Sequence, residues 1–324
     1  MSVEVFGHTK DGWPVRIVTF SGGGVTARLM EWGATLVELR LDGVDHTLTL
    51  GFDDFTTYET HSQHVGAIAG RFAGRIAGGF SQDGLRHETT RNNGTATLHG
   101  GQQGFGLSLW TLTDHGRDFA ELSLTQPSGT DGFPGDVAAI CRYEANVGGL
   151  HLTLSATSDA PTICNLAQHS YFNLSGRQTI DDHSLRLEAT KYTPLNEDLL
   201  PTGAIDDVQG EWDFREIRRI GSTQLDGHFV LARARRSVPA LAATVRGGKL
   251  QMQVETTEPG LVFYRADKLP VCPGIKGQTL GPRAGICLES QLWPDAPNQS
   301  GFPSATLAPD VPYKQETFYR FSRI

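Results

Sequence analysis

The sequence predicts an all-β protein, a single large antiparallel β-sandwich that extends over residues 1–324. Segments with apolar residues at alternate positions recur, whereas helical periodicity is hard to find. Glycine accounts for 38 of 324 residues, well above the usual share of about 7%, and separates short strand-like segments. Strand signals continue along the whole chain without a proline-rich linker, so one sandwich is the economical architecture. Two tightly packed sheets, counted as two domains, remain the alternative.

Three segments carry the clearest strand pattern, because their alternate residues are apolar. They are HLTLSATS (151–158), SLRLEAT (184–190) and LQMQVET (250–256). Pro259 and Gly260 form a turn signal after the third segment, which predicts a hairpin over residues 250–264. The stretch DGFPGD (131–136) predicts another turn.

The segment GAIAGRFAGRIAGGF (66–80) has a glycine at every fourth position, with Arg71 and Arg75 between them. A helix here is disfavoured, because each interior glycine costs roughly 1 kcal/mol relative to alanine. Neither common phosphate-loop pattern occurs in it. We therefore expect an irregular or strand-edge segment, in which glycines let backbone approach backbone and the arginines project toward a place that needs positive charge.

Composition excludes several classes of function. The net charge is −8 and basic residues form no runs, which argues against a nucleic-acid surface. No apolar run approaches the ~20 residues of a membrane helix, so no membrane partner is expected. The chain opens without a secretory leader, which predicts a cytoplasmic location. The four cysteines lack a C-x-x-C motif and are expected to be reduced, and mostly buried, thiols.

Polar residues with catalytic potential interrupt the β background. Glu289 follows the apolar run AGICL of a buried strand, so its carboxyl group needs either a structural partner or a task that uses a perturbed pKa. His169 in NLAQHSYFNLSG is a candidate catalyst or a hydrogen-bonded core histidine. His99 lies beside a Gly-Gly pair, and QLDGHFVL offers Asp226 and His228.

An ordered set of motifs spans the chain and closely resembles the aldose 1-epimerase (galactose mutarotase) family. The resemblance begins at Asp11-Gly12 and at WGATL (32–36), and it reaches the final strand. Its motifs are GRFAGRI, LHGG, DGFPGD, HSYFNLSG, LLPTG, LDGHF, LESQLWPDAPN and FPSATLAPDVPYKQETFYRF. The resemblance implies a galactose mutarotase-like β-sandwich that interconverts the anomers of a free monosaccharide without a metal or an organic cofactor.

The same resemblance implies a role for each of five residues. Glu289 matches the general base and His169 the general acid, while Arg71, His99 and Asp226 match sugar-binding positions. Anomer exchange requires one proton to leave the C1 hydroxyl while another reaches the ring oxygen. We therefore expect an ionised Glu289 and a protonated His169 near neutral pH, with Arg71 nearer to sugar oxygens than to the imidazole.

Two positions depart from the family pattern. Gly74 and Gln168 stand where the family usually has asparagine. The missing amide at position 74 removes a potential hydrogen bond to ligand or loop, which affects the choice of substrate more than the reaction. Trp293 is expected either to stack on a sugar face or to pack in the core.

Four alternatives remain open. Glu289 and Asp226 could serve as the two carboxylates of a glycoside hydrolase, or the chain could be a non-catalytic sugar-binding module. A hexose 6-phosphate substrate would need a basic cluster, for which charge alone suggests Arg142, Arg215, Arg218 and Arg219. His61 and His64 of HSQH offer two metal ligands without an evident third, and surface histidines are the simpler interpretation.

Overall fold

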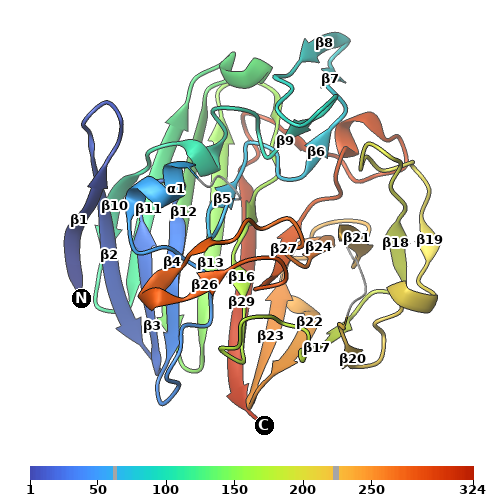
Figure 1. Ribbon diagram of the computed structural model, residues 1–324. Helices are drawn as coiled ribbons and strands as arrows, with labels where there is room; N and C mark the ends of the chain where they lie inside the picture. Colours follow the sequence, from blue (N-terminus) through green and yellow to red (C-terminus); the bar gives the residue numbers. More distant parts are fainter. Residues whose placement is uncertain (61–63, 222–225) are drawn as a thin grey trace.

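The computed structural model describes residues 1–60, 64–221 and 226–324, and in these ranges the regular structure is almost entirely β (Figure 1). The strand ladders are antiparallel, which confirms the predicted fold class. One short helix, α1 (Phe55–Thr60), and a few single 3₁₀ turns are the helical elements of the described ranges. No helix in these ranges is long and apolar enough to cross a membrane.

The largest sheet of the described chain supplies one layer of the sandwich. Its strands, in spatial order, are β10 (Thr111–His115), β11 (Phe119–Gln126), β12 (Val137–Asn146), β13 (Gly149–Ser158), β29 (Tyr313–Arg323), β23 (Leu250–Thr256), β22 (Ala240–Gly247), β17 (Ser184–Leu187) and β20 (Arg218–Arg219). Buried and more exposed residues alternate along β12, β13 and β23. The sheet therefore has one face in the core and one toward solvent, as the period-two pattern predicts.

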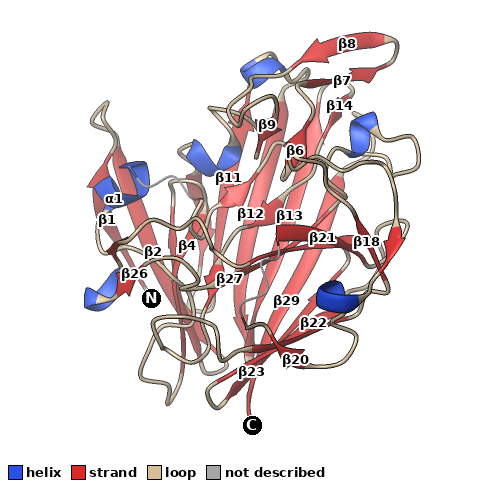
Figure 2. Ribbon diagram, turned by 45° about the vertical axis from the view of Figure 1, so that its right-hand side comes forward, coloured by secondary structure: helices blue, strands red, loops and turns tan. Residues whose placement is uncertain are grey.

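Two further sheets cover the inner face of the largest one. The first is β1 (Ser2–His8), β2 (Pro14–Gly22), β3 (Val25–Met30) and β4 (Thr35–Leu41). The second is β16 (Tyr171–Phe172), β27 (Ile286–Gln291), β24 (Gly260–Tyr264), β21 (Asp226–Val230), β18 (Lys191–Thr193) and β19 (Asp206–Asp207). Figure 2 shows β27 and β21 lying in front of the long strands β12, β13 and β29.

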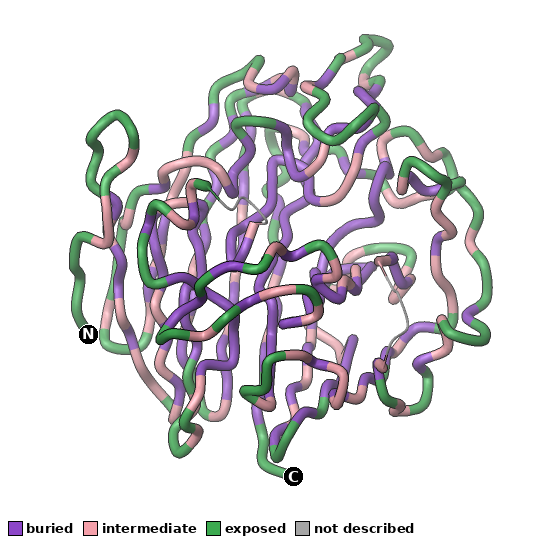
Figure 3. The backbone as a smooth tube through the Cα atoms, in the orientation of Figure 1, coloured by how far each residue is buried: buried purple, intermediate pink, exposed green. Residues whose placement is uncertain are grey.

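The core lies between these layers. Leu152 of β13, Leu29 of β3 and Leu288 of β27 belong to one continuous cluster of buried apolar side chains. Figure 3 shows the same arrangement along the backbone, with buried residues concentrated in the central strands and exposed residues in the peripheral loops. The sandwich prediction is confirmed, and a single domain over residues 1–324 stays a prediction.

Short paired strands make up the rest of the sheet structure in the described ranges. They are β5 (Ile68–Ala69) with β15 (Ala167–Gln168), β6 (Arg75–Ile76) with β9 (Thr97–Leu98), β7 (Gly79–Gln82) with β8 (Leu85–Glu88), β14 (Thr162–Ile163) with β28 (Thr306–Leu307), and β25 (Cys272–Pro273) with β26 (Thr279–Leu280). The glycine-spaced segment 66–80 contains β5, β6 and the start of β7, separated by bends, as expected for a strand-edge segment. A Cβ atom at position 66 would lie 2.3 Å from the carbonyl oxygen of Leu36. Glycine at this position therefore lets the backbone pass close to that of Leu36.

Most of the predicted strands and turns are confirmed, and one is wrong. HLTLSATS lies in β13, LQMQVET coincides with β23, and DGFPGD lies between β11 and β12, whereas the strand in SLRLEAT ends at Leu187. The hairpin over residues 250–264 does not form, because β23 pairs with β22 and β29 while β24 pairs with β21 and β27. Pro259-Gly260 lies where the chain passes from one sheet to another. A turn signal marks the change of direction and leaves the partner strand unspecified.

Candidate active site

Strand register brings the predicted acidic residues onto one sheet face. In β27, Ile286 and Leu288 belong to the core cluster, so Glu289 points to the opposite face. Across the ladders, Glu289 pairs with Val262 of β24, and Val262 pairs with His228 of β21. These three side chains therefore form a row across the sheet. The next row contains Asp226, because Asp226 pairs with Tyr264 and Tyr264 with Cys287.

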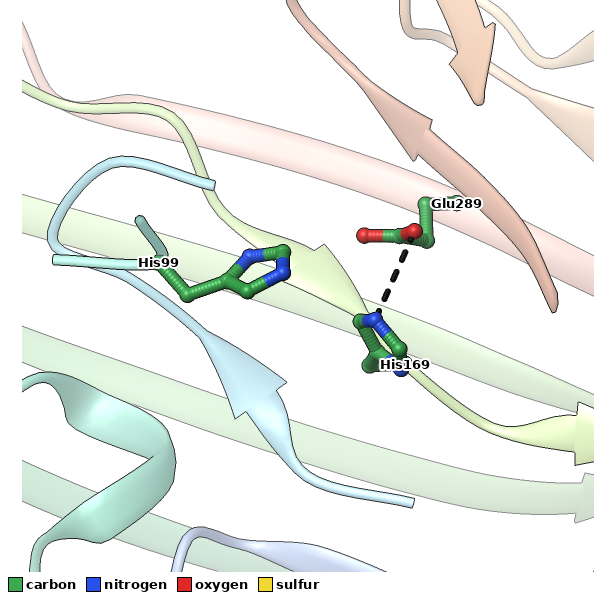
Figure 4. Close-up of side chains that lie close together, drawn as sticks. All are labelled: His99, His169 and Glu289. Carbon is green, nitrogen blue, oxygen red and sulfur yellow. Dashed lines mark ion pairs between the residues drawn. The ribbon is translucent and has the colours of Figure 1, made fainter. Parts of the chain in front are cut away.

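Two histidines approach this face from other elements. His169 lies between β15 and β16, and His99 follows β9 with a φ of +52°. Figure 4 shows both imidazole rings near the Glu289 carboxyl group. The Nε2 atom of His169 is 3.6 Å from Oε1 of Glu289, and the centroids of the two imidazole rings are 5.1 Å apart. The structure thus brings together three residues that are far apart in the sequence.

These residues line a cavity of about 780 Å³, within the usual size range of small-molecule sites. Asp226 lines the same cavity, so four of the five predicted site residues meet there. Other polar residues on its wall include His64, Arg75, Arg91, Asn92, Asn93, Gln102, His228, Tyr264, Lys268 and Gln291. Its wall is richer in polar groups than that of a usual small-molecule pocket, so it suits a ligand with many hydrogen-bonding groups.

Burial controls the protonation of the central pair. It raises the pKa of Glu289 to about 8, with a smaller contribution from the nearby Asp226 charge and an opposing one from Arg75. Burial also lowers the pKa of His169 to about 3, helped by His64. The expectation of an ionised Glu289 and a protonated His169 is therefore corrected for the ligand-free cavity. Desolvation disfavours both charged forms, and the proton resides on the carboxyl group.

His99 is oriented by backbone. The Gly74 N–H donates to Nδ1 of His99 at 3.3 Å, and the His99 N–H donates to the Gly74 carbonyl at 3.1 Å. A neutral His99 therefore carries its proton on Nε2, where it can donate a hydrogen bond into the cavity. Burial and the neighbouring histidines hold the pKa of His99 well below its usual value. A neutral His99 is thus a hydrogen-bond donor on the cavity wall.

Arg71 requires a correction, because the structure places it away from the cavity. Its guanidinium group is fully buried and donates to Oε1 and the carbonyl of Gln126 and to the carbonyls of Pro134 and Gly135, at 2.8–3.3 Å. It is absent from the cavity wall. Arg75, four residues later, lines the cavity and lies close enough to Glu289 and Asp226 to favour their ionised forms. Arg75, and not Arg71, is therefore the arginine of this segment that lines the cavity.

Several cavity atoms have unused hydrogen-bonding capacity. In the described part of the chain, Oε2 of Glu289, Oε1 of Gln291, Nε2 of His228 and Nδ1 of His64 are buried on cavity-lining residues without a hydrogen-bond partner. Buried polar atoms normally have partners. Their concentration here indicates that a bound ligand supplies the missing hydrogen bonds.

The sequence analysis missed Gln291 and underrated His64. Gln291 is two residues beyond Glu289 on β27, so the period-two rule applied to this strand would have found it. His64, taken above as a surface residue, lines the cavity with its ring centroid 4.8 Å from that of His99. His61 of the same motif lies outside the described residues.

Other expected contacts are absent from the cavity wall in the described chain. Trp293 is fully buried and donates from Nε1 to the Pro259 carbonyl at 3.1 Å, so it is a core residue. Gln168 is also buried in the core, where its side chain hydrogen-bonds Ser170 and Tyr319. The arginines considered for a phosphate, none of which lines the cavity, are Arg142, Arg215, Arg218 and Arg219.

The central cluster is a poor fit to a metal ion as it stands. His99, His169 and Glu289 each place one potential ligand atom within 4.8 Å of the others. Two nitrogen or oxygen ligands of one zinc ion lie at most about 4 Å apart, given bonds of roughly 2 Å. The 3.6 Å contact between His169 and Glu289 is longer than a hydrogen bond, and catalytic groups at such a distance commonly come closer when substrate binds.

Comparison with known proteins agrees with this geometry. The family model for aldose 1-epimerase matches residues 16–320. The galactose mutarotase of Bos taurus is 34% identical over 311 residues, which cover 91% of this chain and 90% of that protein. The aldose 1-epimerase of Escherichia coli K12 is 32% identical over 333 residues, covering 96% of both chains.

Solved structures of similar proteins share the fold. A GalM/aldose epimerase homologue from C. elegans superposes with a TM-score of 0.88 and 29% identity, covering 95% of this chain and 99% of that chain. Galactose 1-epimerase from Lactobacillus acidophilus superposes with a TM-score of 0.86 and 28% identity, covering 99% and 98%. Family model, relatives and structures all cover nearly the whole chain. This chain therefore belongs to the aldose 1-epimerase family.

Proposed function

We propose that this protein is an aldose 1-epimerase, an isomerase that interconverts the α and β anomers of a free aldose. The observation that carries the proposal is the pair of His169 and Glu289, whose proton-carrying atoms lie 3.6 Å apart on the wall of the cavity. The names of its relatives, galactose mutarotase and aldose 1-epimerase, support the same reaction.

The reaction proceeds by opening and reclosing the sugar ring. Glu289, as a carboxylate, takes the proton of the C1 hydroxyl, and His169 donates a proton from Nε2 to the ring oxygen, so the bond between C1 and the ring oxygen breaks. The product is an open-chain aldehyde beside a protonated Glu289 and a neutral His169. After rotation about the C1–C2 bond, the two proton transfers run in reverse and the ring closes on the other face of the aldehyde.

The number of protons on the pair stays constant throughout. Burial favours a protonated Glu289 beside a neutral His169. The pair has the same protonation when it faces the open-chain aldehyde. A bound ring form requires this proton to move from Glu289 to His169. Sugar hydroxyls that donate to Glu289, together with the charge of Arg75, favour the carboxylate and so promote this transfer.

The remaining polar residues orient the sugar. His99 donates from Nε2, while Asp226 accepts from sugar hydroxyls. Arg75 donates to sugar oxygens near the reacting carbon. Gln291 and His228 supply the unpaired oxygen and nitrogen atoms described above. No metal or organic cofactor takes part, and the proposed partner is a small monosaccharide.

A cytoplasmic location belongs to the same proposal. All four cysteines are free and buried, as is usual for proteins of a reducing compartment. The wider function of the protein would then be in intracellular carbohydrate metabolism.

Polarimetry on freshly dissolved α-glucose, α-galactose, xylose and arabinose tests this function. The parent protein should accelerate the approach to the same final rotation, and Glu289→Gln and His169→Asn should each lower kcat about 10²–10⁴-fold. Glu255→Gln, on the outer face of β23 where Glu255 pairs with Arg320, and His115→Asn, at an exposed histidine, are matched controls that should keep full activity. All variants are first checked for folding by circular dichroism.

The rival functions give different results in the same assay. Release of a reducing sugar from a glycoside would support a hydrolase that uses Glu289 and Asp226. Sugar binding by the folded parent without any acceleration would support a non-catalytic module. Acceleration with glucose 6-phosphate alone would instead identify an epimerase of phosphorylated sugars.

A further inference from the structure

Cys287 lies directly behind His169, on the side of the imidazole ring away from Glu289. Its Sγ atom is 3.4 Å from Nδ1 of His169 and 3.8 Å from the His169 carbonyl oxygen. The thiol is fully buried, and it shares a face of β27 with Glu289 because the two residues are two positions apart. One strand therefore supplies contacts to both nitrogen atoms of the same ring.

Tyr171 completes this arrangement from the neighbouring strand. It pairs with Cys287 across the ladder between β16 and β27, and the centroid of its ring is 5.2 Å from that of the His169 ring. The S–H group of Cys287 has the His169 carbonyl oxygen as an acceptor. A lone pair of the sulfur then remains on the side of Nδ1 of His169. It can accept a hydrogen bond from Nδ1 only when Nδ1 carries the hydrogen.

We propose that Cys287 is a positioning residue that holds neutral His169 in the tautomer with hydrogen on Nδ1. The lone pair of Nε2 then faces Glu289, so Nε2 is the atom that exchanges a proton with Glu289 and with the sugar. This inference rests on the proposed function, because it assigns the tautomer that the epimerase reaction uses.

The chemical character of the partner matters as much as its position. In serine proteases a carboxylate accepts from the histidine and stabilises the imidazolium that forms. A thiol is a weak, uncharged acceptor, so it fixes the tautomer without stabilising the positive charge. His169 therefore remains a strong proton donor once protonated, which suits protonation of a weakly basic ring oxygen.

Nitrogen-15 NMR of the histidine side chains tests the assignment on the ligand-free protein. The His169 signals are identified by their loss in His169→Asn. The parent should show Nδ1 protonated and Nε2 unprotonated. Cys287→Ser keeps an acceptor and should keep this tautomer with kcat within about threefold of the parent. Cys287→Ala should populate the other tautomer and lower kcat about tenfold with KM nearly unchanged, the lower end of the loss usual when a residue that orients a functional histidine is replaced.

Cys141→Ala is the matched control, since it removes the same atoms from a fully buried cysteine on β12. It should leave the His169 signals and kcat unchanged. A parent protein with Nε2 protonated would overturn the inference without any variant, even if Cys287→Ala fails to fold. An active Cys287→Ala with parental kcat and tautomer would overturn it as well. Absence of turnover in the parent would overturn the proposed function instead, while NMR still decides the tautomer.

Discussion

Nε2 of His169 and Oε1 of Glu289 lie 3.6 Å apart, with side chains that are only 6% and 4% exposed. Burial shifts the pKa of the carboxyl group up to about 8 and that of the imidazole down to about 3. Between these values the ligand-free pair holds one proton. The pair loses this proton only in alkaline solution and gains a second one only in strong acid. Because the two groups interact, the two apparent pKa values describe the pair as a whole and not the individual residues.

This relationship predicts the pH dependence of kcat/KM. The reaction needs one proton on the pair, so kcat/KM should be flat from about pH 4 to pH 7. Above about pH 8 the pair loses its proton and no acid remains, so the rate should fall about tenfold per pH unit. Polarimetry in buffers of constant ionic strength measures the profile. A rate that rises through pH 8 would show that the pair acts without this proton.

Replacing Glu289 with glutamine should stabilise the folded protein at neutral pH. The pKa of this carboxyl group is raised on folding from 4.5 to about 8, so ionisation opposes folding increasingly as the pH rises through this interval. Glutamine avoids that cost, a gain of up to about 3 kcal/mol at pH 7. Below pH 4.5, the pKa of this carboxyl group in the unfolded chain, it is protonated in both the folded and the unfolded protein. The stability gained by the glutamine variant should therefore vanish there.

Thermal unfolding of the parent and Glu289→Gln at pH 7 and pH 4 measures this difference. The melting temperature of the variant should exceed that of the parent by several degrees at pH 7 and match it at pH 4. Equal melting temperatures at both pH values would mean that the carboxyl group pays no desolvation cost in the folded protein.

Arg71 and Arg75 should respond oppositely to substitution. Arg71→Met leaves the buried carbonyls of Gln126, Pro134 and Gly135 without their donor, so it should lower the free energy of unfolding by about 2–4 kcal/mol. Arg75→Met removes a half-buried side chain whose one hydrogen bond to protein is to Asn93, at 3.1 Å, among the described contacts. It should lower kcat/KM about 10–100-fold with little change in stability. Denaturant titration and polarimetry on both variants separate the effects, and the reverse pattern would return Arg71 to the sugar site.

These two arginines also mark how far the sequence could predict the site. Glu289 was found because it follows an apolar run in a regular strand, where alternation fixes which face a side chain occupies. Arg71 and Arg75 lie in a segment of two-residue strands and bends, where no period applies. The sequence pattern therefore could not distinguish which arginine lines the cavity. The motif match indicated Arg71, which lies outside it.

The protonation states and the strand partners could not be predicted from the sequence, for a related reason. The pKa values of Glu289 and His169 depend on burial and on His64, Arg75 and Asp226, which lie far apart in the sequence, and no local pattern encodes this. The failed hairpin has the same cause, since Pro259-Gly260 specifies a turn and long-range packing selects the partner strands. The fold class was predictable because apolar alternation and glycine-rich turns recur along the whole chain, and helical periodicity does not.

Chelation should leave the activity unchanged. The proposed reaction moves only protons, and the described cluster of His99, His169 and Glu289 spreads to 4.8 Å, wider than the shell of one zinc ion. We expect the parental rate to persist after dialysis against EDTA and to stay the same when Zn²⁺ or Mg²⁺ is returned. Loss on dialysis with recovery on addition of one metal would assign these three residues to a metal site.

Gly74 should influence which aldose is preferred. It lines the cavity with a φ of +80°, and a Cβ atom there would lie 3.2 Å from Nε2 of Gln291. Asparagine tolerates this backbone conformation better than most residues, so Gly74→Asn should fold and place an amide against Gln291. The ratio of KM values for glucose, galactose and xylose should change by about threefold or more, the effect of roughly one hydrogen bond.

The pH profile of Gly74→Asn should match that of the parent, because Glu289 and His169 are untouched. Gly84→Asn is the matched control, since Gly84 has a φ of +77° and open space around it in the turn between β7 and β8. It should leave all three KM values unchanged. If Gly74→Asn also leaves them unchanged, position 74 does not contact the sugar, and other cavity residues, such as Asp226 and Tyr264, determine the specificity of this protein.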